Sequence, residues 1–219
     1  MEGDAPENSW SAIRLGHQLG ADLIEVDVQM SQDNVLFLHH NYQIQDGIWC
    51  NDLPWDELKK AKIQGEPLPT LEDVLIWARN AGAHLSLDMK TFFKPARSLA
   101  KEVVRLLERT NMKENVLLLF FDHKELFHTK LACPDLTVRA LVTGRLANFA
   151  DYLRHIKADC VSISYGMLRS EDIEQIHSIG AAMVLVDYWD QNNELFQQYD
   201  IDVLSVGSPL DARRILNHQ

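Results

Sequence analysis

The stretch ADLIEVDVQMSQDNVLFLHHN, residues 21–41, decides the fold. Its first eight residues predict a buried strand, yet Glu25 and Asp27 stand two apart in that strand and point the same way. Burying an unpaired charge is costly, so this strand face either meets water or holds a positive group between the two acids.

The next apolar run, VLFLHH at 35–40, follows after only QMSQDN. A parallel crossover needs about a dozen residues or more, so the spacing predicts a hairpin with its turn around 31–34. Residues at equal distances from a hairpin turn face each other, which would place His40 close to Glu25.

Apolar runs of strand length recur along the rest of the chain. Their near-continuous apolar character is typical of parallel strands that are covered on both faces. The runs are 84–90, 115–121, 137–142, 159–164, 181–187 and 202–207.

Helix signals lie between these runs. Thr70 is the expected N-cap of LEDVLIWARNAG, which Gly82 should end, and Asn8 or Ser9 should cap a helix that begins at Trp10. Three more N-caps are expected, at Asp122, Ser170 and Asp190.

This alternation predicts an α/β fold, either a (β/α)8 TIM barrel or an open parallel sheet. The strands number seven parallel ones plus the antiparallel return strand, so the first strand of a barrel is not recognisable. No linker or low-complexity tract divides the chain, and residues 1–219 are therefore expected to form one domain.

Composition narrows the classes of function. A net charge of −11 argues against a groove for nucleic acid, which needs basic residues to neutralise phosphates. No apolar run approaches the roughly 20 residues of a transmembrane helix. The three cysteines, Cys50, Cys133 and Cys160, are far apart, so we expect free thiols in a reducing compartment and a cytoplasmic location. The sequence leaves the oligomeric state open.

Carboxylates late in parallel strands indicate a site, because the carboxyl ends of such strands meet at one edge. Glu25, Asp27 and Asp88 would offer oxygen ligands to a hard cation, Mg²⁺ or Ca²⁺. Lys90 lies two residues after Asp88 and would serve a phosphate oxygen. Two other interpretations stay open: a strand face in contact with water, and an ion pair between Asp88 and Lys90 within one strand.

The segment PENSWSAIRLGHQLGADLIEVDVQMSQDNVLFLHHN (6–41) resembles the opening of the glycerophosphodiester phosphodiesterase family, which typically reads PENT and then GAD-x-IE-x-DV. LPTLEDVL, LSLDMK, FFD at 120–122 and DVLSVGSP extend the resemblance along most of the chain. The resemblance implies the phosphodiesterase type of TIM barrel. It also implies metal-dependent hydrolysis of a glycerophosphodiester, with glycerol 3-phosphate and an alcohol as products.

Carried over position by position, the resemblance assigns Glu25, Asp27 and Asp88 as ligands of Mg²⁺ or Ca²⁺. It assigns His40 as a catalytic histidine and Lys90 as a substrate-binding residue. His39 points the other way and is expected to be structural.

Several positions depart from the family pattern. Asp88 stands where the family usually has Glu, Asn41 where it has Asp, and QDG (45–47) where it has the arginine-bearing RTT. Val186 replaces a tryptophan, and MEGDA at the front contains no HRG strand with the other catalytic histidine. We therefore expect a chain that is incomplete at its N-terminus and poorly stable or nearly inactive. The alternatives are a non-catalytic binding module that keeps the barrel and, less favoured, a relative of phospholipase D-like toxins.

Overall fold

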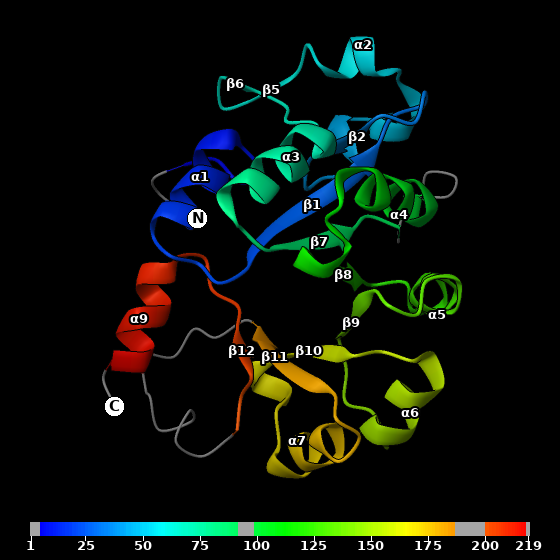
Figure 1. The fold of residues 1–219 in the computed structure, drawn as a ribbon, viewed down its shortest axis with the longest axis vertical. Coiled ribbons are helices and arrows are strands. Elements are labelled where there is room, and N and C mark those ends of the chain that lie inside the picture. The colour runs from blue at the N-terminus through cyan, green and yellow to red at the C-terminus, as the bar shows by residue number, and fades with distance from the viewer. Residues whose placement is uncertain (1–4, 92–98, 187–199, 218–219) are drawn as a thin grey trace.

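The computed structural model describes residues 5–91, 99–186 and 200–217. Its central feature is an eight-stranded sheet with the hydrogen-bonded order β12-β11-β10-β9-β8-β7-β1-β2 (Figure 1). Neighbouring strands are parallel except β1 and β2, which confirms the prediction of seven parallel strands and one return strand. The strands are β1 (Ile24–Met30), β2 (Leu36–Leu38), β7 (Leu85–Met89), β8 (Val116–Phe120), β9 (Thr137–Val142), β10 (Cys160–Ser164), β11 (Ala182–Val186) and β12 (Val203–Leu204).

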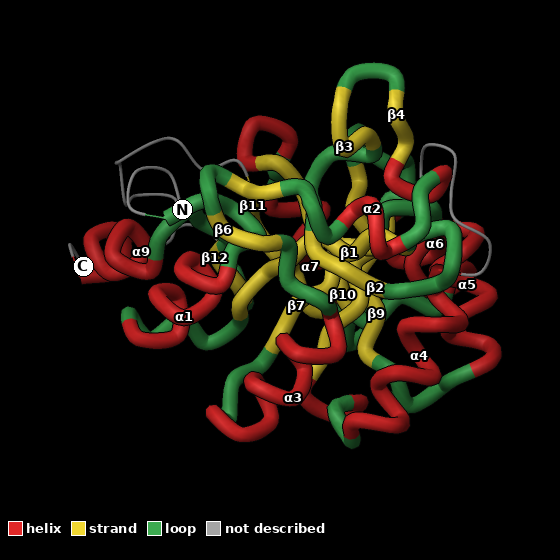
Figure 2. Tube along the Cα trace, turned by 90° about the horizontal axis from the view of Figure 1, so that it is seen from above, coloured by secondary structure: helices red, strands yellow, loops and turns green. Residues whose placement is uncertain are grey.

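Helices pack on the outer side of these strands, as the view from above shows (Figure 2). They are α1 (Trp10–Gln18), α3 (Leu71–Ala81), α4 (Leu99–Thr110), α5 (His123–Ala132), α6 (Phe149–Ile156), α7 (Ser170–His177) and α9 (Pro209–Asn217). Between β2 and α3 lie two small hairpins, β3 (Gln43–Gln45) with β4 (Ile48–Trp49) and β5 (Lys62–Ile63) with β6 (Glu66–Pro67), and the short helix α2 (Trp55–Leu58). Three single 3₁₀ turns complete the described elements, at Cys50–Asp52, Lys113–Asn115 and Tyr165–Met167.

Most predicted helix ends are confirmed. The side chains of Ser9, Thr70 and Asp122 accept hydrogen bonds from backbone N–H groups of the first turns of α1, α3 and α5. Gly82 ends α3 with a left-handed φ of 68°, a conformation that glycine adopts without strain. The prediction for Ser170 is wrong by one residue, because the extended backbone that marks an N-cap belongs to Arg169. Asp190 lies outside the described residues.

The β1–β2 hairpin is confirmed, but its register differs from the prediction. Val28 pairs with Leu38 and Met30 with Leu36, so the turn contains five residues rather than four. The Ser31 backbone N–H donates to the Val35 carbonyl at 3.0 Å, and the Ser31 hydroxyl accepts from the Val35 N–H at 2.9 Å. The longer turn shifts the cross-strand partners by one position. The prediction that His40 lies opposite Glu25 is therefore wrong by one residue.

Alternation along the strands separates two interiors. One set of residues packs against the helices as an apolar core that contains Val26, Val28, Leu87, Val138 and Ile163. The other set faces the inside of the curved sheet. Strand register places Asp27, Asp88, Leu119, Arg139 and Cys160 in one row on this inner side. The polar residues of that row build the candidate site.

Candidate metal centre

Asp27 and Asp88 are direct neighbours across the parallel pair β1–β7, with their side chains on the same face. The Lys90 ammonium lies between them, with Nζ 2.5 Å from Asp27 Oδ1 and 2.6 Å from Asp88 Oδ2. All three side chains are buried. Burial lowers the pKa of Lys90, but the charges of Asp27 and Asp88 outweigh that effect, and the net shift is upward. The ion pair between Asp88 and Lys90, one of the interpretations left open, is therefore present, and Asp27 shares it.

Asn8 holds Asp27 from the opposite side. Its amide nitrogen donates to Asp27 Oδ2 at 2.6 Å, and its amide oxygen accepts from the Asp27 backbone N–H at 2.8 Å. Asn8 is buried and has a left-handed φ of 57°, a conformation that asparagine tolerates better than most residues. The sequence identified Asn8 only as a possible helix cap. Its place in the PEN motif was the signal that could have found this contact.

Glu25 completes a group of three carboxylates. One potential ligand oxygen of each of Glu25, Asp27 and Asp88 lies within 4.8 Å of the others. Solvent reaches Glu25, yet enough protein surrounds it that desolvation is the main cause of its raised pKa, about 7. The charges of Asp27 and Asp88 raise this pKa further.

The donor set fits a hard divalent cation. Oxygen-only carboxylate ligands are those that Mg²⁺ and Ca²⁺ prefer. Asp88 is 5% exposed, and its Oδ1 is buried without a hydrogen-bond partner among the described residues. Such an oxygen is costly to leave unpaired in a protein interior, and a cation would satisfy it. Glu25, Asp27 and Asp88 are thus the residues that could hold a metal.

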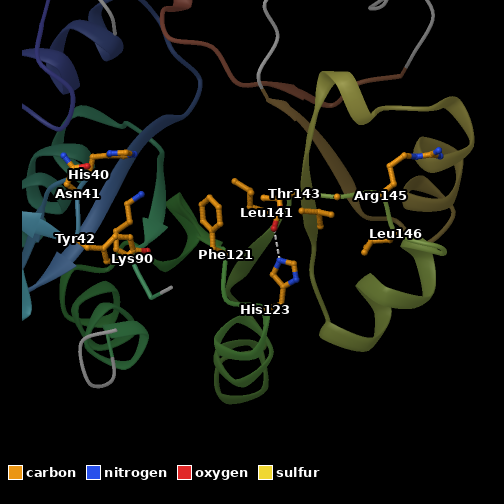
Figure 3. A pocket seen from close by; sticks show the side chains of 12 residues that line it. His40, Asn41, Tyr42, Lys90, Phe121, His123, Leu141, Thr143, Arg145 and Leu146 are labelled. Atoms are coloured by element: carbon orange, nitrogen blue, oxygen red, sulfur yellow. Dashed lines mark hydrogen bonds between the residues drawn. The ribbon is translucent and has the colours of Figure 1, made fainter. Parts of the chain in front are cut away.

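His40 and Lys90 line one cavity of about 600 Å³ at the carboxyl ends of β7, β8 and β9 (Figure 3). His40 is exposed, and its Nδ1 lies 4.0 Å from Glu7 Oε1. Figure 3 shows Lys90 and His40 on one side of the cavity, Phe121 and Leu141 at its centre and Arg145 on the far side. The structure therefore brings His40 and Lys90 to the same cavity, while Lys90 also reaches the carboxylates.

His39 and His123 are held by structural contacts. Nε2 of His39 lies 3.3 Å from the Gln43 carbonyl, and burial lowers the pKa of this histidine. His123 lines the cavity, but its Nε2 contacts the Leu141 carbonyl at 2.9 Å and its Nδ1 the Tyr152 hydroxyl at 2.7 Å. Both ring nitrogens of His123 are thus engaged in joining α5 to β9 and α6.

Arg139 is a charged residue of the inner row that sequence reasoning missed. It is 4% exposed, and its Nε is buried without a hydrogen-bond partner among the described residues. Its charge interacts with Glu25 and, more weakly, with Asp88. The hydroxyls of Ser86 and Ser162, on the same inner side, are likewise buried without partners in the described part of the chain. The signal was an arginine within the apolar run TVRALV.

Comparison with known proteins places this geometry in a family. The model of the glycerophosphoryl diester phosphodiesterase family matches residues 1–207. The chain belongs to this family. The membership confirms the resemblance and makes the chain a phosphodiesterase-type hydrolase.

Related sequences agree with this assignment. A glycerophosphodiester phosphodiesterase of Caldanaerobacter subterraneus is 26% identical over 151 residues, which are 63% of this chain and 62% of that protein. The uncharacterized protein YqiK of Bacillus subtilis is 28% identical over 169 residues, or 71% of this chain and 69% of its own length.

Solved structures confirm the barrel type of fold. A glycerophosphodiester phosphodiesterase from Parabacteroides distasonis is 24% identical and superimposes with a TM-score of 0.83, covering 96% of this chain and 91% of that one. An Oleispira antarctica phosphodiesterase, solved with the product sn-glycerol-3-phosphate, is 21% identical with a TM-score of 0.83, covering 99% and 93%. No helix among the described residues has the length and apolar character needed to span a membrane.

Proposed function

We propose that this chain hydrolyses glycerophosphodiesters to glycerol 3-phosphate and an alcohol, with Mg²⁺ or Ca²⁺ held by Glu25, Asp27 and Asp88. The observation that carries the proposal is the group of three carboxylates, within 4.8 Å of one another, beside a cavity that Lys90 and His40 line. The family membership and the glycerol 3-phosphate bound to the Oleispira antarctica relative support the same substrate class.

Each residue has a distinct proposed role. A divalent cation at the carboxylates would act as a Lewis acid on a phosphoryl oxygen. Lys90 supplies an ammonium for another phosphate oxygen, and Asn8 keeps Asp27 in place. His40 transfers a proton at the attacking or the leaving oxygen, a contribution typically worth about 10²- to 10⁴-fold in rate.

Turnover is expected to be slow. The chemistry needs both an acid and a base, and of the two histidines that line the cavity in the described part of the chain, only His40 has an exposed ring. Both nitrogens of His123 are already engaged. A reducing compartment belongs to the same proposal, because Cys50, Cys133 and Cys160 are all free thiols.

The test is release of glycerol 3-phosphate from glycerophosphocholine and glycerophosphoethanolamine with Mg²⁺, Ca²⁺ or EDTA. We expect release that EDTA abolishes and that Asp88→Asn and His40→Ala each reduce by about 10²-fold or more. His128→Ala is the matched control, since His128 is an exposed residue on α5 that lines no part of the cavity. Equal activity of His40→Ala and His128→Ala would remove His40 from the mechanism.

A second candidate is a non-catalytic module that binds a metal or an anion. The departures from the family pattern favour it: Asp88 stands in place of the usual Glu, Asn41 in place of Asp, and QDG (45–47) in place of RTT. Folded protein that binds Mg²⁺ or Ca²⁺ in calorimetry but releases no product from either substrate would support this candidate.

A further inference from the structure

Lys90 lies where a cation bridging two strands would have to lie. Its Nζ lies 2.5 Å from one oxygen of Asp27 and 2.6 Å from one oxygen of Asp88, slightly closer than the about 2.7–2.9 Å that is usual for an ammonium and a carboxylate. Ca²⁺ takes carboxylate oxygens at about 2.3–2.6 Å and Mg²⁺ at about 2.0–2.1 Å. An ammonium and a divalent cation therefore cannot both occupy the space between these two carboxylates.

The Lys90 side chain can also reach the neighbouring cavity. Its backbone is fixed, since its N–H donates to the Val28 carbonyl at 3.2 Å, but four flexible methylenes carry the ammonium. The same side chain lines the cavity that His40 and Phe121 share (Figure 3). Rotation of the side chain alone can thus transfer the charge from the carboxylates to the cavity.

We propose that Lys90 occupies the cation position between Asp27 and Asp88 in the metal-free protein, and that a divalent cation releases it to the cavity as an anion-binding group. This inference rests on the proposed function and deepens it. Before release, the ammonium is neutralised by two carboxylates and attracts no phosphate. After release, it faces the cavity, while the cation balances Asp27 and Asp88.

The exchange couples the two ligands. If the cation frees Lys90 for an anion, then the anion must raise the affinity for the cation by the same factor. Couplings of this kind are typically about 5- to 150-fold. In Lys90→Met the competing ammonium is gone, so we expect tighter Mg²⁺ binding without anion and a smaller coupling than in the unmodified chain.

The decisive measurement is the rate at which Lys90 reacts with an amine reagent. Brief reductive methylation followed by peptide mass spectrometry is performed with EDTA, Mg²⁺ or Ca²⁺. Because the released fraction sets the rate, we expect the cation to accelerate labelling of Lys90 by roughly 5- to 150-fold. Lys130 is the internal control. It is paired with Asp159 at 2.8 Å, and its labelling should not change with the cation.

Calorimetry of Mg²⁺ with and without sn-glycerol 3-phosphate completes the test, with circular dichroism to confirm that Lys90→Met is folded. Lys60→Met, which removes an exposed surface ion pair with Glu57, controls for the loss of one charge. If the cation binds and the labelling rate of Lys90 does not rise, the proposed exchange is wrong. If the same protein nevertheless hydrolyses the substrate, the proposed function stands without the exchange.

The remaining outcomes separate the two ideas. Accelerated labelling of Lys90 without hydrolysis would support the exchange and contradict the proposed function. Cation binding by Lys90→Met but not by the unmodified chain would also support the exchange. If neither protein binds a cation, both the exchange and the proposed metal site are wrong.

Discussion

Asn8 should be among the most sensitive positions of the site, although it is neither a proposed ligand nor a proposed catalyst. Replacing Asn8 with Gly removes both hydrogen bonds to Asp27 while keeping a residue that accepts the φ of 57°. A hydrogen bond to a charged group contributes about 1.5–3 kcal/mol, and an unsatisfied buried N–H costs about 1–3 kcal/mol. The expected loss in the free energy of unfolding is therefore about 2.5–6 kcal/mol.

Replacement of Asn8 with Ala should cost more than replacement with Gly. Alanine pays about 1–2 kcal/mol for a left-handed backbone, and this term adds to the lost hydrogen bonds. Urea unfolding in EDTA measures both variants, with an unchanged m-value showing that the unfolded states are comparable. We also expect Mg²⁺ affinity to fall by about 10- to 100-fold, because Asn8 orients the proposed ligand Asp27.

The matched control is Asn148→Ala. Asn148 caps α6 by accepting from the Asp151 N–H at 2.9 Å, in an exposed position far along the chain from the site. Loss of such a cap costs about 1 kcal/mol and should leave Mg²⁺ affinity unchanged. If Asn8→Gly lowers stability no more than Asn148→Ala does, then Asn8 does not hold Asp27 and the reasoning is refuted.

Three further predictions concern thiols, pH and the buried guanidinium. Burial raises the pKa of Cys50 to about 12 and that of Cys160 to about 11. Iodoacetamide at about pH 8 should therefore modify Cys133 in the native protein and spare Cys50 and Cys160 until the protein unfolds. Modification of all three cysteines at one rate would contradict this prediction. The pKa of Glu25 is about 7 in the folded protein, compared with an ordinary value of about 4.5 in the unfolded chain. Between these two pH values the folded state binds more protons than the unfolded state. Thermal stability in EDTA should therefore fall as pH rises from about 4.5 to about 7. Glu25→Gln should flatten that part of the profile, and an unchanged slope would assign it to another group. Arg139→Met should lower the free energy of unfolding in urea by about 3–5 kcal/mol, because it removes a buried positive charge that interacts with Glu25 and Asp88. An unchanged free energy of unfolding would show that Arg139 does not balance these carboxylates.

Local patterns in the sequence were sufficient to predict the strands and most helix ends. Each apolar run predicts a strand because a parallel strand buried on both faces has few polar positions. All eight strands of the central sheet overlap those runs. The N-caps at Thr70 and Asp122 and the stop at Gly82 depend on contacts within a few residues, so they too could be read directly. The two-residue period of a strand also placed Glu25 and Asp27 on one face.

The tertiary structure decided what those side chains meet. Whether Lys90 serves a phosphate or pairs with carboxylates depends on the β1–β7 register, which brings Asp27 beside Asp88 from a position 61 residues earlier in the chain. The approach of Asn8 to Asp27 and the inward position of Arg139 likewise arise from packing between distant segments. Even the hairpin register depended on a hydroxyl contact within a turn. Sequence patterns report which face of an element is buried, because that follows from its own period. The partner on that face is set by contacts between elements, and these form only when the sheet assembles.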